Sequence, residues 1–281
     1  MRAGLARSII RNRTAAAGMG ITAAIVLAVT IGGALSPYSA TDMDFFNLLA
    51  APSLAHPFGT DSFGRDVLTR VLFGARVSLL VSASGVVMAA LAGTATGMTA
   101  AYKGGYADLV LMRVADLLFA FPAFVLALFL MVVLGFGAVN VSVAIALTYL
   151  PIFARLARNM TLLVREEPYV QAARLMGQST PRILAREILP NIAAPLIVQA
   201  TIGIAFGIII EAGLSFLGVG VQPPTPSLGV IMADGREYFQ RGPWVLTLTG
   251  LAISIALLGL NLFGDGLRDM MDPRLRQRAE Q

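Results

Sequence analysis

The side chains whose chemistry could form a binding site gather in one polar segment near the start of the chain. His56, Asp61, Arg65 and Asp66 place an imidazole, two carboxylates and a guanidinium close together. These four groups could form a ligand site. Alternatively, they cap and pin a short amphipathic helix from Asp66 to Arg76, and we favour this interpretation because polar residues at a helix start most often serve as caps.

Enzymatic chemistry finds little support elsewhere in the sequence. The chain has no Cys and one His, which excludes disulfides, thiol catalysis and metal cages built from Cys or His. A phosphate-binding P-loop needs Gly-x-x-x-x-Gly-Lys followed by Ser or Thr, whereas the single Lys, Lys103, lies in AYKGGY. We therefore expect no catalytic, cofactor or metal site in this chain.

A second polar stretch, residues 165–191, predicts two short helices joined by a tight turn. Pro168 suits the first helical position, where an amide would be unpaired anyway. Gly177 ends the first helix because glycine takes the left-handed C-terminal conformation without strain. The second helix is expected to begin at Pro181 and to stop at Pro190. One face of the first helix carries apolar and small side chains, namely Tyr169, Ala172, Ala173 and Met176.

Composition decides the fold class. The 281 residues are 57% hydrophobic and 13% charged, with a mean hydropathy of +0.76, which is too apolar for a soluble globular domain. We predict an all-α polytopic membrane protein, because a membrane-spanning backbone must satisfy its hydrogen bonds within each segment. The first apolar run could be a secretory signal, but its length suits an uncleaved anchor. Six transmembrane helices are predicted, at Ala15–Leu35, Ser78–Ala101, Leu117–Leu134, Val139–Ala154, Ile192–Ile210 and Trp244–Phe263.

The distribution of cations predicts which ends face the cytoplasm. With six spans, sixteen of the 21 Lys and Arg residues lie on the side of the two termini. The positive-inside rule places both termini and the polar stretch in the cytoplasm. The net charge of +5 could suggest nucleic acid, but no run alternates basic and aromatic residues, so we expect no nucleic-acid partner. The predicted segments are an N-terminal tail (1–14), a first transmembrane helix (15–35), an external loop with an interfacial helix (36–77), a core (78–264) that includes a cytoplasmic loop (155–191), and a C-terminal tail (265–281).

The interiors of the predicted spans are small and uncharged. Gly93 and Gly97, and likewise Gly203 and Gly207, have the spacing that lets helices approach closely, either for plain packing or for a sliding, gating interface. No carboxylate, Lys or His lies in the middle of a span, although intramembrane charges usually mark a proton or ion pathway. This absence argues against a proton-coupled carrier.

The polar stretch 165–191 resembles the cytoplasmic coupling loop, called the EAA loop, of permease subunits of bacterial ABC importers. That pattern is Glu-Ala-Ala, three residues, Gly, and a Pro roughly a dozen residues later. The matching residues are Ala172, Ala173, Gly177 and Pro190. Gln171 stands where Glu is usual, and Glu187 where a basic residue or His is expected. Three longer stretches, 56–79, 211–239 and 261–276, resemble the C-type permease of dipeptide and oligopeptide importers.

This resemblance implies a type I ABC-importer permease fold in the bacterial cytoplasmic (inner) membrane. It implies one half of a pore for dipeptides or short oligopeptides, completed by a B-type permease among membrane lipids. An extracytoplasmic substrate-binding protein would deliver the peptide, and partner ATPase subunits would bind ATP and Mg. The residues implied to contact the ATPase or to shape the coupling loop are Tyr169, Gln171, Ala172, Ala173, Arg174, Met176, Gly177 and Pro190.

A second candidate site lies on the external side. The segment QPPTP is stiff because proline fixes its own φ and restricts the residue before it. It could contact the binding protein, narrow the external mouth, or act only as a connector, while Glu211 could face the translocation path or cap a helix end. The candidate residues are Glu211, Gln222, Pro223, Pro224 and Pro226. Other functions left open are a permease for nickel or another small solute, a secondary carrier, and a structural membrane subunit.

Overall fold

The computed structural model describes residues 13–33 and 36–271, and this part of the chain forms helices and loops without a strand. The tails predicted at 1–14 and 265–281 lie partly outside it. The helices are α2 (Arg13–Leu27), π-helical η1 (Ala28–Gly32), α4 (Val67–Lys103), α5 (Gly105–Phe119), α6 (Ala123–Leu134), α7 (Ala138–Val164), α8 (Pro168–Leu175), α9 (Thr180–Ile183), π-helical η2 (Leu184–Ile188), α10 (Leu189–Phe216), α11 (Leu228–Glu237) and α12 (Pro243–Met271).

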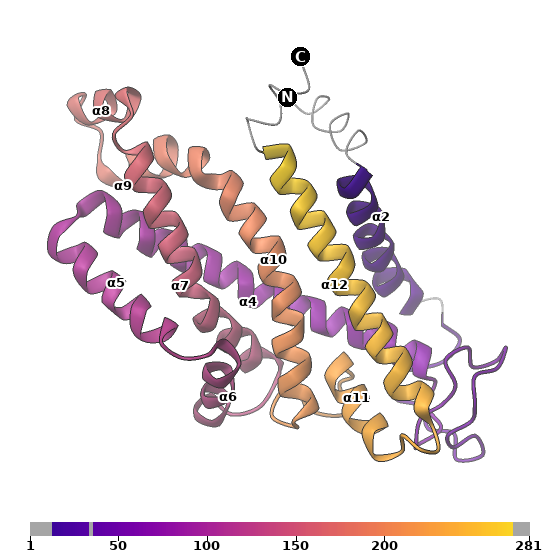
Figure 1. Ribbon diagram of the computed structural model, residues 1–281. Coiled ribbons are helices and arrows are strands. Elements are labelled where there is room, and N and C mark those ends of the chain that lie inside the picture. The colour runs from indigo at the N-terminus through magenta and orange to yellow at the C-terminus, as the bar shows by residue number, and fades with distance from the viewer. Residues whose placement is uncertain (1–12, 34–35, 272–281) are drawn as a thin grey trace.

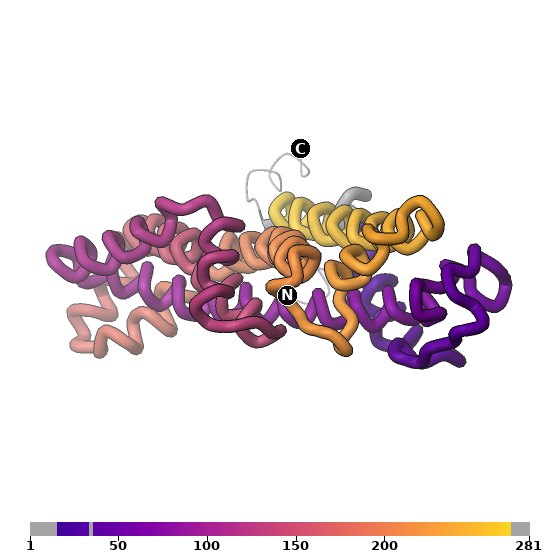
Figure 2. The backbone as a smooth tube through the Cα atoms, turned by 90° about the horizontal axis from the view of Figure 1, so that it is seen from below, coloured from indigo at the N-terminus to yellow at the C-terminus, as the bar shows by residue number. Residues whose placement is uncertain are grey.

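The helices form an elongated slab. Figure 1 shows α5, α7, α10, α12 and α2 in that order from one edge to the other, and α4 crosses behind them obliquely. Seen from below, the slab is long and thin (Figure 2). The start of α2, the end of α12 and α8 lie on one side, whereas α11 and the segment before α4 lie on the other. The polar helix α8 is thus at the opposite end of the bundle from α11 and the segment before α4.

Glycines let α4 pack closely against its neighbours. A Cβ atom on Gly93 would lie 2.6 Å from the Leu150 carbonyl oxygen of α7, and one on Gly97 would lie 2.1 Å from that of Ala154. On α10, Gly203 and Gly207 pack against Val86 and Ser82 of α4, with 3.1 Å from each virtual Cβ to the nearest side-chain atom. The predicted close approach is confirmed for both glycine pairs. This contact region holds the largest buried cluster, around Val86, Ile145 and Phe153.

Four helices of the described chain are each long and apolar enough to cross a membrane: α4, α7, the continuous stretch Thr180–Phe216, and α12. A fifth span is counted if α5 and α6 act together, and Ala16–Gly32 is a shorter apolar helix. The polytopic all-α fold is therefore confirmed, and the six-span topology stays a prediction.

Two of the predicted helices differ from the observed ones. Leu117–Leu134 was expected as one span, but the end of α5 and α6 share these residues and meet at an angle of 93°. Pro122 explains the break, because it has no N–H for a helical hydrogen bond and stands at the N-cap of α6 with extended ψ of 132°. The interfacial helix expected from Asp66 to Arg76 is not separate, since α4 continues without a break through the second span.

Pro190 was expected to stop a helix, and that prediction is wrong. The chain stays helical from Thr180 to Phe216. The wide turn η2 shifts the hydrogen-bond register, so that the Leu189 amide donates to the Leu184 carbonyl five residues back. This shift lets Pro190 enter the first turn of α10, where its missing N–H is tolerated.

Candidate functional site

The polar helix α8 has the predicted start and end. Glu167 is its N-cap, Pro168 lies in its first turn, and Gly177 has a φ of +74°. The Gly177 amide donates to the Arg174 carbonyl at 3.0 Å, and the Gln178 amide to the Ala173 carbonyl at 3.2 Å. This pair of bonds defines a Schellman motif, which satisfies the last carbonyls of the helix and requires the left-handed residue that glycine supplies.

The exposed surface of α8 carries large apolar side chains beside polar ones. Only Val170 and Ala173 are buried against the rest of the chain. Leu175 is 89% and Met176 72% exposed, and Tyr169 is also exposed. Large apolar side chains on a short polar helix are costly to leave in water. This face therefore has the character of a contact surface, and Ala172 keeps it flat enough for close approach.

A cationic cavity of about 520 Å³ borders α8. Lys103, Arg165 and Arg174 line it together with Glu166. Arg165 donates through Nη1 to the Ala101 carbonyl at 2.5 Å, which ties the end of α7 to the end of α4. The excess of positive charge suits an acidic side chain of a partner.

Two side chains of α8, Gln171 and Tyr169, have environments that the structure defines. The Gln171 amide nitrogen donates to the Glu166 carbonyl at 3.3 Å, a bond that a Glu carboxylate could not make. Desolvation raises the pKa of the Tyr169 phenol, and the nearby charges of Glu167 and Glu187 add to the rise. Tyr169 is therefore a neutral hydrogen-bonding group at physiological pH.

The residues predicted for the external mouth differ in burial. Glu211 is fully buried within α10, where it accepts a hydrogen bond from Ser215 Oγ at 2.7 Å. Gln222 donates to the carbonyls of Gly218 and Gly220 at 3.1 Å each, which braces the loop. Residues 222–225 are exposed at the end of the bundle opposite α8. The structure does not bring the residues predicted for the coupling loop close to those predicted for the external mouth.

The titratable residues of the segment before α4 cap and pin this helix. Asp66 Oδ2 accepts from the Thr69 amide at 2.8 Å, and Asp66 Oδ1 lies 2.9 Å from His56 Nδ1. Asp61 Oδ2 accepts from Arg65 Nε at 2.7 Å and also from Arg70. The favoured interpretation of these residues is supported by this network.

Sequence reasoning missed two members of the network. Arg70 is 2% exposed and pairs with Asp61, and both Arg65 and Arg70 also pair with Asp234 of α11. Arg70 stands one helical turn after Asp66, which was an available signal. Asp234 is distant in sequence, and nothing local indicated its approach.

A polar cavity between α5 and α7 was also missed. It contains two ion pairs, Asp108 with Arg158 and Asp116 with Arg155. The available signal was the pair of aspartates eight residues apart, with Arg113 between them, on a helix that is mostly apolar.

Comparison with known proteins decides the family of this arrangement. The family model described as "Binding-protein-dependent transport system inner membrane component" matches residues 93–277, from the α4–α7 contact through α8 to the end of α12. The chain belongs to this family. It is a multi-pass permease of the inner membrane, and the family description makes it one component of a binding-protein-dependent transport system.

Relatives of this permease have names that specify small peptides. It is 39% identical over 270 residues to the dipeptide transport system permease protein DppC of Alkalihalophilus pseudofirmus, with 96% of this chain and 89% of that protein covered. It is 39% identical over 279 residues to the di/tripeptide transport system permease protein DppC of Pseudomonas aeruginosa, covering 97% and 92%. It is 42% identical over 264 residues to the glutathione transport system permease protein GsiD of Escherichia coli, covering 92% and 87%.

Proposed function

We propose that this permease forms one half of the translocation path of an ABC importer for dipeptides or other short peptides. The observation that carries the proposal is α8, a helix with exposed Tyr169 and Leu175 beside a cationic cavity, in a chain of the binding-protein-dependent transport family. The names of three relatives, for dipeptide, di/tripeptide and glutathione transport, support a peptide cargo. The other half of the path is a B-type permease.

The proposed topology has six spans with both termini in the cytoplasm. The bent pair α5 and α6 counts as one span, and α2 with η1 as another. The starting end of α2 and the final end of α12 lie on the side of α8 (Figure 1). The cations of the sequence concentrate on the same side, which supports a cytoplasmic position for α8.

Energy enters the permease through α8. ATP and Mg²⁺ are bound by partner ATPase subunits, and α8 seats in a groove of an ATPase. Leu175 and Met176 supply apolar contact area, and Arg174 with Lys103 faces an acidic residue of the ATPase. Exposed ion pairs contribute only about 0–1 kcal/mol. Shape and backbone geometry therefore carry most of the coupling.

Movement of α8 reaches the spans on either side. Only the short turn at residues 165–167 separates it from α7, and Thr180–Phe216 is one helical stretch after it. A push on α8 tilts α7 and α10 against α4, and the permease switches between inward-open and outward-open states. On the external side, Gln222, Pro223, Pro224 and Pro226 contact the substrate-binding protein.

The test is ATP-dependent uptake of labelled di- and tripeptides in cells with and without this chain, with nickel uptake measured beside it. Loss of peptide uptake on deletion, restored by the wild-type gene, is the expected result. Lost nickel uptake with unchanged peptide uptake would replace the cargo. Peptide uptake that survives ATP depletion and stops with a proton-gradient uncoupler would reject the ABC mechanism.

A further inference from the structure

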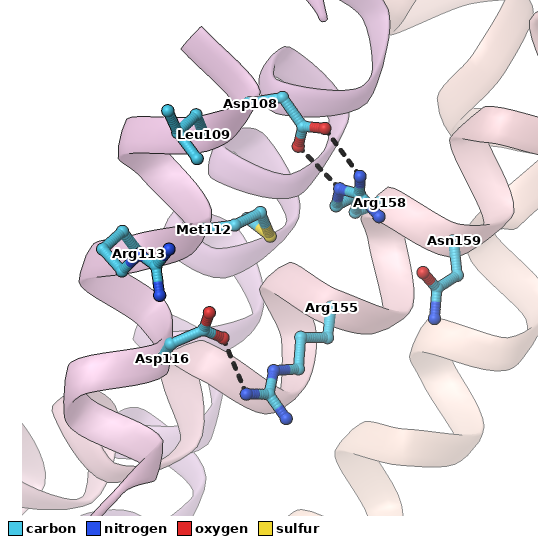
Figure 3. Close-up of a pocket in the computed structure, with 8 residues that line it drawn as sticks. All are labelled: Asp108, Leu109, Met112, Arg113, Asp116, Arg155, Arg158 and Asn159. Carbon is cyan, nitrogen blue, oxygen red and sulfur yellow. Dashed lines mark hydrogen bonds and ion pairs between the residues drawn. The ribbon is translucent and has the colours of Figure 1, made fainter. Parts of the chain in front are cut away.

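A cavity of about 410 Å³ lies between α5 and α7, a volume typical of small-molecule sites. Figure 3 shows Asp108 and Asp116 on α5 pointing toward Arg158 and Arg155 on α7. Arg158 donates through Nε and Nη2 to the two Asp108 oxygens, each at 2.6 Å. Arg155 donates through Nη2 to Asp116 Oδ1 at 2.7 Å.

The first pair is complete and the second is not. Asp108 and Arg158 satisfy each other through two parallel bonds, which fix the spacing of α5 and α7 at one end of the cavity. Arg155 uses one nitrogen only, and its guanidinium is held 4.2 Å from the centroid of the Phe119 ring. The other N–H groups of Arg155 make no hydrogen bond within the described chain.

Two more donors border the same cavity. Arg113 and Asn159 line it, and within the described chain neither side chain has a hydrogen-bond or ion-pair partner. Both are exposed. With three arginines and two aspartates, the lining has one net positive charge, and the free donors of Arg113, Arg155 and Asn159 supply it with hydrogen bonds.

Two of these charged side chains, those of Arg113 and Asp116, lie on the exposed surface of α5. Asp116 lies eleven residues after Gly105, which is about 16 Å along α5 at 1.5 Å per residue. The other exposed residues of α5 include Leu109, Val114 and Leu117. Charged side chains on such a helix usually face a bundle interior or a water-filled path and mark a site.

We propose that Arg113 and Arg155, assisted by Asn159, bind the carboxylate end of the transported peptide as it passes along α5 and α7. The inference rests on the proposed function and names the residues that would hold its substrate. Two guanidinium groups match a carboxylate well, since each presents paired N–H donors. The free Asp116 oxygen accepts a hydrogen bond from a peptide N–H, and Asp108 with Arg158 is a positioning pair.

The test uses the complete importer in proteoliposomes, with the binding protein, and compares wild type, Arg113→Gln and Arg113→Lys. Arg113→Gln removes a hydrogen bond to a charged group, so peptide uptake at low peptide concentration should fall by about tenfold or more. Arg113→Lys keeps the charge and should recover part of the peptide uptake. Arg76→Gln, at an exposed arginine on α4, is the matched control and leaves uptake unchanged. The amount of assembled complex is measured for every variant, and uptake is compared per assembled complex.

Other outcomes overturn the inference in distinguishable ways. Wild-type uptake by Arg113→Gln removes this site and leaves the proposed function intact. Absence of peptide uptake by the wild-type importer removes both. The same cavity could hold a lipid phosphate, so the assay is repeated in liposomes without anionic lipid. If the wild-type importer loses as much peptide uptake in these liposomes as Arg113→Gln loses in the original ones, the ligand is a lipid headgroup and the peptide carboxylate is rejected.

Discussion

Replacing Gly177 by valine tests whether the turn after α8 transmits force. Gly177 has a φ of +74°, and no atom lies within 4 Å of the place where a Cβ would stand. The cost of a side chain is therefore conformational and not steric. A left-handed L-residue costs roughly 1–2 kcal/mol, and a β-branched residue lies at the upper end of that range.

The rest of α8 has little burial to offset that strain. Only Val170 and Ala173 pack against the chain, and two backbone bonds hold the turn. A penalty of about 1–2 kcal/mol lowers the ratio of permease molecules with the native turn to those with an altered turn by a factor of about 5–30. An ATPase that binds only the native turn would then bind up to about 5–30 times more weakly, with uptake reduced and the membrane level of the chain unchanged.

Gly218 offers a matched control. It ends α10 with the same pair of bonds, from the Gly218 amide to the Ser215 carbonyl and from the Val219 amide to the Leu214 carbonyl, both at 3.0 Å. Its φ is +81°, and its Cβ position is also open. Gly218→Val therefore carries the same strain at the opposite end of the molecule. The assay is the affinity of purified ATPase subunits for permease in nanodiscs. Equal affinities for the two variants would refute the assignment of α8 as the coupling helix.

Two further predictions concern stability. Asp61→Asn leaves Arg70 buried beside a weaker partner, and this should lower the free energy of unfolding by about 3–5 kcal/mol. Asp116→Asn changes an ion pair whose side chains are 42–47% exposed, and it should change the free energy of unfolding by about 0–1 kcal/mol. Thermal unfolding in detergent compares the two, and equal losses would contradict the argument from burial. Gly97→Ala places a Cβ 2.1 Å from the Ala154 oxygen and should cost about 1–3 kcal/mol, whereas Gly250→Ala in α12 meets nothing within 4 Å and should be neutral or stabilising. The same measurement would disprove the close-packing account if Gly97→Ala were harmless.

Local features of the sequence predicted the start and the end of α8 well. The start at Pro168 and the end at Gly177 follow from backbone constraints on proline and glycine, which act within a few residues. The close approaches at Gly93 and Gly97 were predictable for a similar reason, because only small side chains permit such contacts.

The errors arose where proline had two possible effects. Pro122 breaks a span and Pro190 does not, and the difference is the wide turn η2, which moves the hydrogen-bond register before Pro190. No pattern in the residues 184–188 announced that turn.

Long-range contacts were beyond local patterns. Asp234 meets Arg65 and Arg70 only because α11 folds back onto the start of α4. The ion pairs between α5 and α7 likewise depend on how two spans cross.

The most direct test of the central claim, that α8 is the contact through which ATPase subunits drive this permease, is site-specific cross-linking. The natural chain has no Cys, so Leu175→Cys, at an 89% exposed position on α8, gives a single reactive thiol. Phe46→Cys, at a 99% exposed position in the segment before α4, is the control on the opposite side of the bundle. With a short thiol-to-amine cross-linker in inverted vesicles, Leu175→Cys is predicted to form an adduct with the ATPase and Phe46→Cys is not. Absence of an ATPase adduct from Leu175→Cys in an importer that still transports peptide would contradict the account.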